Sequence, residues 1–218
     1  MAGPVMNKGR KNIIFILAAL SLAGCQTGGP GNETSAVPEG NLVGARIGGD
    51  FALTDQTGKT VRWSDFKGKY RLVYFGYTWC PDVCPVDLNK FMAGLKLLEA
   101  SDPAKAAKIQ PIFITVDPER DTPDVIAPYV AAFHPRLIGL TGTPEQIEAV
   151  KKDFVVIAGK EGDPAAKSDY LVSHTRTPAL FDPDGKPIAL VPVDDVLNDD
   201  KDSAPPEAVR DFLAAYVR

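Results

Sequence analysis

The feature that most constrains this 218-residue chain is a pair of cysteines placed between a predicted strand and a predicted helix. Cys80 and Cys84 follow a continuous apolar run over residues 72–75, which indicates a buried strand. They precede an amphipathic run over 86–99, which indicates a helix. A helix N-terminus favours the negatively charged thiolate through its dipole and its free N–H groups. Because thiolates attack disulfides and also bind soft metals, the pair is compatible with redox chemistry and with metal binding.

Residues 1–24 are typical of an export signal rather than of a folded domain. A positively charged segment precedes an apolar stretch over 13–23 that is too short and wrongly flanked for an ordinary membrane-spanning helix. The stretch ends in Leu22-Ala23-Gly24-Cys25, which resembles a bacterial lipobox and implies cleavage before Cys25 and lipidation of its sulfur. The alternative is an uncleaved signal anchor. Either one predicts a domain on the periplasmic side that stays tethered to the bacterial membrane.

Lipidation of Cys25 leaves Cys80 and Cys84 as the only thiols of the exported domain. An exported pair meets oxidising conditions and is able to form a disulfide. A bridge across so short a loop constrains the unfolded chain very little, so a purely structural disulfide is the weaker interpretation. The net charge of −4, with no pronounced basic stretch, argues against a nucleic-acid partner.

The remaining chain divides into a tether and one domain. Residues 25–43 are rich in Gly, Pro, Ser, Thr and Asn and predict a flexible membrane tether, followed by a domain over 44–218. The alternation of elements predicts an α/β thioredoxin-like fold, with a central mixed β-sheet flanked by helices and an N-terminal β-hairpin. We expect hairpins over 51–62 and 179–191, strands over 70–77, 109–116, 137–140 and 155–157, helices over 86–99, 123–133, 144–154 and 205–218, and polar loops over 159–169 and 194–202.

Two sulfurs alone leave a metal ion under-coordinated, so a metal site needs a third ligand. The chain has two histidines. His134 stands at the end of a predicted helix, where a C-terminal cap is the favoured role. His174 stands in a predicted loop between strands, which a thioredoxin-like sheet brings beside the Cys80 loop. The pattern alone leaves His174 open as a metal ligand or as a solvated side chain.

Several motifs together resemble the Sco/SenC family. The first is Tyr77-Thr78-Trp79-Cys80-Pro81-Asp82-Val83-Cys84-Pro85, and the others follow in the family's order and spacing over residues 116–123, 133–142, 169–175 and 182–185. The resemblance extends from about residue 44 to 193. One departure is Arg176-Thr177-Pro178, where the family usually continues with apolar strand residues, so we expect the next strand to start near Ala179.

The resemblance implies a thioredoxin-fold, membrane-tethered copper-binding protein that helps to assemble the dinuclear copper centre of cytochrome c oxidase. It implies that Cys80, Cys84 and His174 are the copper ligands, with two thiolates for Cu(I) and an added imidazole for Cu(II). The implied partners are the copper-bearing oxidase subunit and other extracytoplasmic copper chaperones or thiol reductants. Asp82 lies between the cysteines and is expected to be a solvated carboxylate rather than a ligand.

Two functions of different classes stay open. The first is a metallochaperone that delivers copper or prepares the cysteines of the receiving site. The second is a thiol–disulfide oxidoreductase that uses Cys80 and Cys84 as a redox pair. His174 favours the first, because a pure reductase needs no metal-ligating histidine. A peroxidase of the peroxiredoxin type expects Thr three residues and Pro seven residues before its cysteine, but this chain has Tyr77 and Val73 there.

Overall fold

The structure is a computed structural model that describes residues 40–162, 169–176, 178–194 and 204–218. Residues 37–218 form one compact unit. The predicted signal, the tether up to residue 39 and the acidic segment 195–203 lie outside the described residues. In the described part of the chain, no helix is both long enough and apolar enough to cross a membrane.

A seven-stranded sheet forms the centre of the unit, in the order β2-β1-β5-β4-β3-β8-β9. Its strands are β1 Ala52–Asp55, β2 Thr60–Arg62, β3 Tyr70–Gly76, β4 Ile109–Thr115, β5 Ile138–Thr141, β8 Ala179–Phe181 and β9 Pro187–Leu190. The three central strands β3, β4 and β5 are parallel, whereas β1 and β8 pair with them antiparallel. The predicted thioredoxin-like fold with a mixed sheet and an N-terminal hairpin is therefore confirmed.

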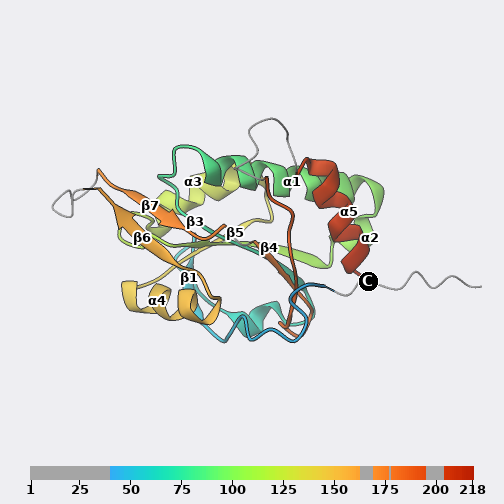
Figure 1. The fold of residues 1–218 in the computed structure, drawn as a ribbon, viewed down its shortest axis with the longest axis horizontal. Coiled ribbons are helices and arrows are strands. Elements are labelled where there is room, and N and C mark those ends of the chain that lie inside the picture. The colour runs from blue at the N-terminus through green and yellow to red at the C-terminus, as the bar shows by residue number, and fades with distance from the viewer. Residues whose placement is uncertain (1–39, 163–168, 177, 195–203) are drawn as a thin grey trace, which may run out of the picture. The chain divides into compact units, whose positions relative to one another are not determined.

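Helices cover both faces of this sheet. They are the 3-10 helix η1 Trp63–Phe66 and the α-helices α1 Val83–Ser101, α2 Pro103–Ala106, α3 Pro123–Phe133, α4 Pro144–Asp153 and α5 Pro206–Tyr216. Figure 1 shows α1, α3 and α5 on one side of the sheet and α4 on the other. Since both faces are covered, the central strands are expected to be apolar along their whole length.

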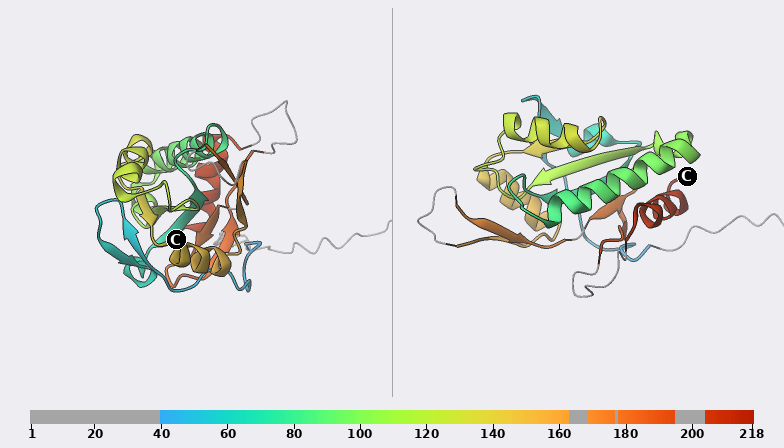
Figure 2. Two further views of the ribbon diagram at one scale, coloured as in Figure 1. Left: turned by 90° about the vertical axis from the view of Figure 1, so that its left-hand side faces the viewer. Right: turned by 90° about the horizontal axis from the view of Figure 1, so that it is seen from above.

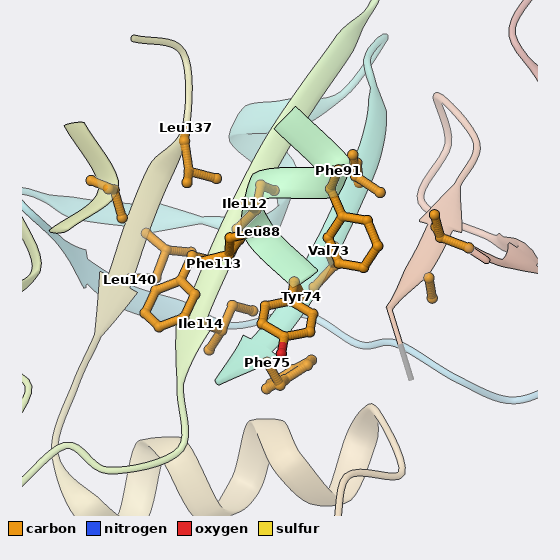
Figure 3. Packing of buried hydrophobic residues seen from close by; sticks show 14 of the residues in the cluster. Val73, Tyr74, Phe75, Leu88, Phe91, Ile112, Phe113, Ile114, Leu137 and Leu140 are labelled. Carbon is orange, nitrogen blue, oxygen red and sulfur yellow. The ribbon is translucent and has the colours of Figure 1, made fainter. Parts of the chain in front are cut away.

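The strand before the cysteines is buried along its entire length. All seven residues of β3 are buried, which confirms the prediction from its continuous apolar run. Figure 3 shows side chains of β3 packed with Leu88 and Phe91 of α1 and with Phe113 of β4. The predicted apolar face of α1 is buried as well, through Leu88, Phe91, Met92, Leu95 and Leu98. Helix α1 begins at Val83, three residues earlier than predicted, so Cys84 lies in its first turn.

The segment after α4 differs from the prediction. Residues 155–157 form no strand, because Val155 adopts a left-handed backbone conformation with φ of 57° that ends the helix. The strand β6 runs instead over Ala158–Glu161, where a polar loop was expected, and pairs antiparallel with β7, Leu171–His174. These two strands form a separate two-stranded sheet, seen at the left of Figure 1 and again in Figure 2.

Candidate metal centre

The two cysteines lie where β3 passes into α1. Cys84 is fully buried in the first turn of the helix, and Cys80 is half-buried in the preceding loop. The backbone N–H of Cys84 donates to Sγ of Cys80 at 3.3 Å. Both cysteines are free thiols. The helix start therefore directs an N–H group at a sulfur, as expected for a site that favours a thiolate.

Gly76 makes room for the buried sulfur at the end of β3. A Cβ at this position would lie 3.2 Å from Sγ of Cys84 and about as close to the rings of Tyr74 and Phe113, at 3.0 and 3.1 Å. Contacts this short force the neighbouring side chains to shift. The strand thus ends in a glycine because the thiol packs directly against its backbone.

The two thiols differ in acidity. A hydrogen bond from Cys84 and three backbone N–H groups, those of Asp82, Val83 and Cys84, lower the pKa of Cys80 to about 5 although partial burial opposes them. The bond to the Cys80 thiolate and burial raise the pKa of Cys84. Cys80 is consequently the accessible thiolate at neutral pH, and Cys84 is the buried thiol.

His174 meets the thiol pair from the other side. It is the last residue of β7 and not a loop residue as predicted, because the segment 171–174 alternates its side chains in the manner of a strand. Its Nε2 lies 3.4 Å from Sγ of Cys84, and its Nδ1 lies 3.1 Å from the carbonyl oxygen of Thr175. The carbonyl can only accept, so Nδ1 carries the proton and Nε2 presents its lone pair to the sulfur. Burial lowers the pKa of His174, which keeps the imidazole neutral.

The chemical nature of these candidate donors suits a soft metal ion. Two cysteine sulfurs and an imidazole nitrogen suit Cu(I), and the imidazole also suits Cu(II). Among the described residues, no three or more His, Cys, Asp or Glu side chains are yet spaced to hold a metal ion. The contacts of Cys84 with His174 and with Cys80 nevertheless place the three candidate donors next to one another.

A cavity of about 280 Å³ gives access to this group of donors. Cys80 and Tyr77 line it on one side, and the antiparallel pair of β6 and β7, called the hairpin below, contributes His174, Leu171 and Glu161. Cys84 does not line the cavity. A molecule that enters the cavity therefore meets Cys80 and His174 first, and Cys84 does not line its wall.

The loop after β4 supports both halves of the site. The buried carboxylate of Asp121 accepts hydrogen bonds from the backbone N–H of Thr78 at 3.0 Å and from the hydroxyl of Thr115 at 2.6 Å, which fixes the cysteine loop. Asp117 accepts from the hydroxyl of Tyr170 at 2.8 Å, at the base of β7. The sequence predicted only a loop here, because the partners of these carboxylates lie up to 53 residues away.

Arg120, in the same loop, makes a second contact with the hairpin. Its Nη1 donates to the carbonyl oxygen of Tyr170 at 2.9 Å, and its guanidinium lies 3.6 Å from the centre of the Tyr170 ring. The guanidinium also lies 5.6 Å from the centre of the exposed Trp79 ring, next to Cys80. One arginine therefore contacts both segments that carry the candidate metal donors.

Three other polar residues considered in the sequence have different surroundings. His134 is the C-terminal cap of α3, as predicted, and its Nε2 lies 3.3 Å from Glu99 near the far end of α1. Asp82 occupies the N-cap position of α1, but its side chain makes no cap hydrogen bond and is exposed, in agreement with a solvated carboxylate. Asp194, expected in a solvated loop, forms an ion pair with Lys90. Cys25 lies outside the described residues.

Comparison with known proteins gives consistent matches. The SCO1/SenC family model matches residues 40–202. The yeast protein "Protein SCO2, mitochondrial" of Saccharomyces cerevisiae is 41% identical over 173 residues, which cover 78% of this chain and 54% of the relative. The SCO2 homolog of Danio rerio is covered to 58%, so the chain spans a little over half the length of these relatives.

Solved structures agree with the sequence matches. Bradyrhizobium japonicum ScoI with copper bound superposes with a TM-score of 0.66 at 38% identity, covering 78% of this chain and 99% of that one. BsSco, described as a member of the Sco family of cytochrome c oxidase assembly proteins with a disulfide switch, has a TM-score of 0.52 at 25% identity, covering 77% and 92%. The match to the family model extends over most of the chain and includes both cysteines and His174. This chain belongs to the SCO1/SenC family.

Proposed function

We propose that this protein is a membrane-tethered copper metallochaperone that serves the dinuclear copper centre of cytochrome c oxidase. The observation that carries the proposal is the meeting of three soft or borderline donors: Nε2 of His174 lies 3.4 Å from Sγ of Cys84, which in turn contacts Cys80. A histidine with its lone pair directed at a dithiol is an arrangement suited to metal binding.

Copper is the cargo in this proposal, with Cys80, Cys84 and His174 as its ligands. The similar ScoI protein of Bradyrhizobium japonicum has been solved with copper bound, which supports copper over other soft metals. Two thiolates hold Cu(I), and the imidazole completes a site for Cu(II). Low coordination leaves a position open for a ligand from the receiving protein.

The exposure of the donors gives the transfer a direction. Cys80 and His174 line the access cavity, whereas Cys84 is fully buried. A thiolate of the receiving oxidase subunit approaches the copper through the cavity and first replaces Cys80. The bond to Cys84 breaks last, so the ion stays bound to one protein or the other throughout the exchange.

A second candidate function is reduction of the cysteines of the receiving copper site. The observation in its favour is the unequal acidity of the pair, with the pKa of the half-exposed Cys80 lowered to about 5. The Cys80 thiolate attacks the partner's disulfide and releases one partner thiolate. Cys84 then attacks Cys80, gives up its proton and releases the second thiol, so two electrons pass to the partner and a Cys80–Cys84 disulfide remains. An extracytoplasmic thiol reductant restores the pair.

The domain organisation belongs to the same proposal. Residues 1–24 act as a lipoprotein signal, lipidated Cys25 anchors the chain on the periplasmic side, and residues 25–43 tether the domain. The end of this tether contacts the folded part, because the N–H of Leu42 donates to the carbonyl oxygen of Ile188 at 3.0 Å. Copper reaches a membrane-bound oxidase from a carrier held at the same surface.

Transfer and reduction are separated by one experiment on the copper-bearing oxidase subunit. We mix that subunit, once as the metal-free dithiol and once as the disulfide, with the reduced chain carrying or lacking copper. The proposal expects copper to appear on the dithiol subunit. Reduction of the disulfide subunit without any copper transfer would instead establish the second function.

A further inference from the structure

An ion pair behind the metal centre connects the two elements that carry its donors. Arg176 follows His174 by two residues, and Asp87 follows Cys84 by three on α1. Nη2 and Nε of Arg176 donate to Oδ1 and Oδ2 of Asp87 at 2.6 and 3.0 Å, a two-point contact. The Asp87 side chain is 1% exposed and that of Arg176 is 17% exposed. A buried, two-point pair of this kind restricts both distance and orientation.

Tyr74 adds a third connection at the same place. Its hydroxyl donates to Oδ2 of Asp87 at 3.0 Å, and its ring meets that of His174 nearly at right angles, with centroids 6.5 Å apart. Nη1 of Arg176 also lies 3.4 Å from the carbonyl oxygen of Asp194. The end of β7 is thus held against α1 and β3 directly behind the imidazole.

Apart from this ion pair, the β6–β7 hairpin is held near His174 by Tyr77, whose hydroxyl accepts from the N–H of Val172 at 3.3 Å and whose ring centroid lies 6.1 Å from that of His174. Strands β6 and β7 pair only with each other and not with the central sheet. Arg120 and Asp117 hold the hairpin at Tyr170, four residues before His174. At the His174 end, the described contacts to α1 are the Cys84 sulfur itself and the Asp87–Arg176 pair.

We propose that Asp87 and Arg176 are positioning residues that hold the His174 imidazole over the thiols and thereby give the site its affinity for Cu(II). The inference rests on the proposed function, because it concerns the same copper site. Cu(I) needs only the two thiolates, which α1 and its preceding loop hold without the hairpin. Loss of the ion pair therefore weakens Cu(II) selectively.

The test compares Asp87→Asn, Arg176→Gln and the double variant in the reduced full-length chain. We expect each single variant to lower Cu(II) affinity by roughly 10–100-fold, the usual effect of removing a group that orients a metal ligand. Cu(I) affinity stays within about twofold in the same variants, because both thiolates are retained. Nitrogen hyperfine coupling from the imidazole in the Cu(II) EPR spectrum should weaken in parallel.

The double variant controls for misfolding of the single variants. It replaces both charged side chains with neutral amides, so no buried charge is left without its partner. If the pair acts as a unit, the double variant loses no more Cu(II) affinity than the worse single variant. Arg176→Lys, which keeps the charge but loses the two-point contact, should lie between wild type and Arg176→Gln. Glu99→Gln is the matched control, because it removes an ion pair with Arg136 near the opposite end of the same helix.

A second readout needs no copper. The ring resonances of His174 in NMR spectra of the metal-free chain should shift or broaden in both single variants and stay unchanged in Glu99→Gln. Unchanged resonances together with wild-type Cu(II) affinity would overturn the inference. Equal losses of Cu(I) and Cu(II) affinity that follow the melting temperature would also overturn it. If wild type binds no copper, the proposed function fails, and the NMR result still decides the role of the ion pair.

Discussion

The thiols and the imidazole of the site stand on parts of the molecule that are built differently. Cys84 is enclosed by the main core, between the end of β3 and the first turn of α1. His174 stands at the end of a hairpin that forms its own two-stranded sheet, with exposed residues at Leu171 and Ser173. The main core therefore fixes the thiol pair, whereas the imidazole depends on the contacts that hold the hairpin against that core.

Both cysteines should be indispensable for copper binding. Cys84→Ser and Cys80→Ser should each abolish binding of Cu(I) and Cu(II), because each leaves only one thiolate and one imidazole in the site. Competition titration of the reduced chain measures both affinities. Cys25→Ser is the matched control and should bind copper like wild type. Retained Cu(I) binding in Cys84→Ser would show that the core thiol is not a ligand.

Removal of the imidazole should affect one oxidation state. We expect His174→Ala to lower Cu(II) affinity by more than ~100-fold, since loss of a ligand costs more than loss of a group that merely supports one. Cu(I) affinity should change little. The same titrations give both values, and a Cu(II) affinity equal to that of wild type would contradict the three-ligand site.

Two glycines, one in the core region and one in the hairpin, should differ in their effect on stability when each is replaced by alanine. Gly76→Ala places a Cβ 3.2 Å from Sγ of Cys84 and should cost about 1–3 kcal/mol of unfolding free energy, as overpacking of a core does. Gly159→Ala, in β6 of the hairpin, meets no atom within 4 Å and should change stability by less than about 0.5 kcal/mol. Denaturant unfolding of the metal-free chain measures both. Equal effects would mean that the two regions are packed alike.

The acidity of the pair predicts a pH profile. The pKa of Cys80 is lowered to about 5, so its thiolate persists at pH 6 and is lost only as the pH falls through 5. Alkylation of Cys80 by iodoacetamide at pH 6 should exceed that of an ordinary thiol by about tenfold, because a lower pKa increases the thiolate fraction but weakens each thiolate as a nucleophile. Cys84, whose pKa is raised, should remain unlabelled.

Tandem mass spectrometry locates the label on either cysteine. Denatured chain is the control, in which both thiols should titrate near the ordinary value of about 8.5. A folded-state profile for Cys80 that follows the denatured one would contradict the asymmetric pair.

Local patterns predicted the core region well. The continuous apolar run of β3 and the periodic face of α1 are signals that each segment carries by itself, and both elements formed as expected. The hairpin was predicted poorly. Three successive residues at 155–157 have strong strand propensity, yet the left-handed Val155 ends α4 and moves the strand to 158–161. Propensity gives way here to the geometry of a helix end.

The residues of the candidate site could be proposed from the sequence, but the contacts that support them could not. The cysteine spacing and the resemblance to a family pointed to Cys80, Cys84 and His174 as candidate ligands, and the structure places these three side chains together. The supports join residues distant in sequence, such as Asp121 with Thr78 across 43 residues and Asp87 with Arg176 across 89. Such pairs carry no local pattern, although the polar Arg176 in place of an expected apolar residue was a visible departure.

The most direct test of the proposed copper site is a Cu(II) titration of the reduced full-length chain, followed through the thiolate-to-Cu(II) absorption band. We expect one copper per chain, a band that is lost in Cys80→Ser and in Cys84→Ser, and a band that is altered in His174→Ala. The affinity should fall at acid pH, as thiolates and imidazole become protonated. Absence of the band in wild type, with normal reduction of a disulfide substrate, would contradict the copper site and leave a thiol–disulfide oxidoreductase.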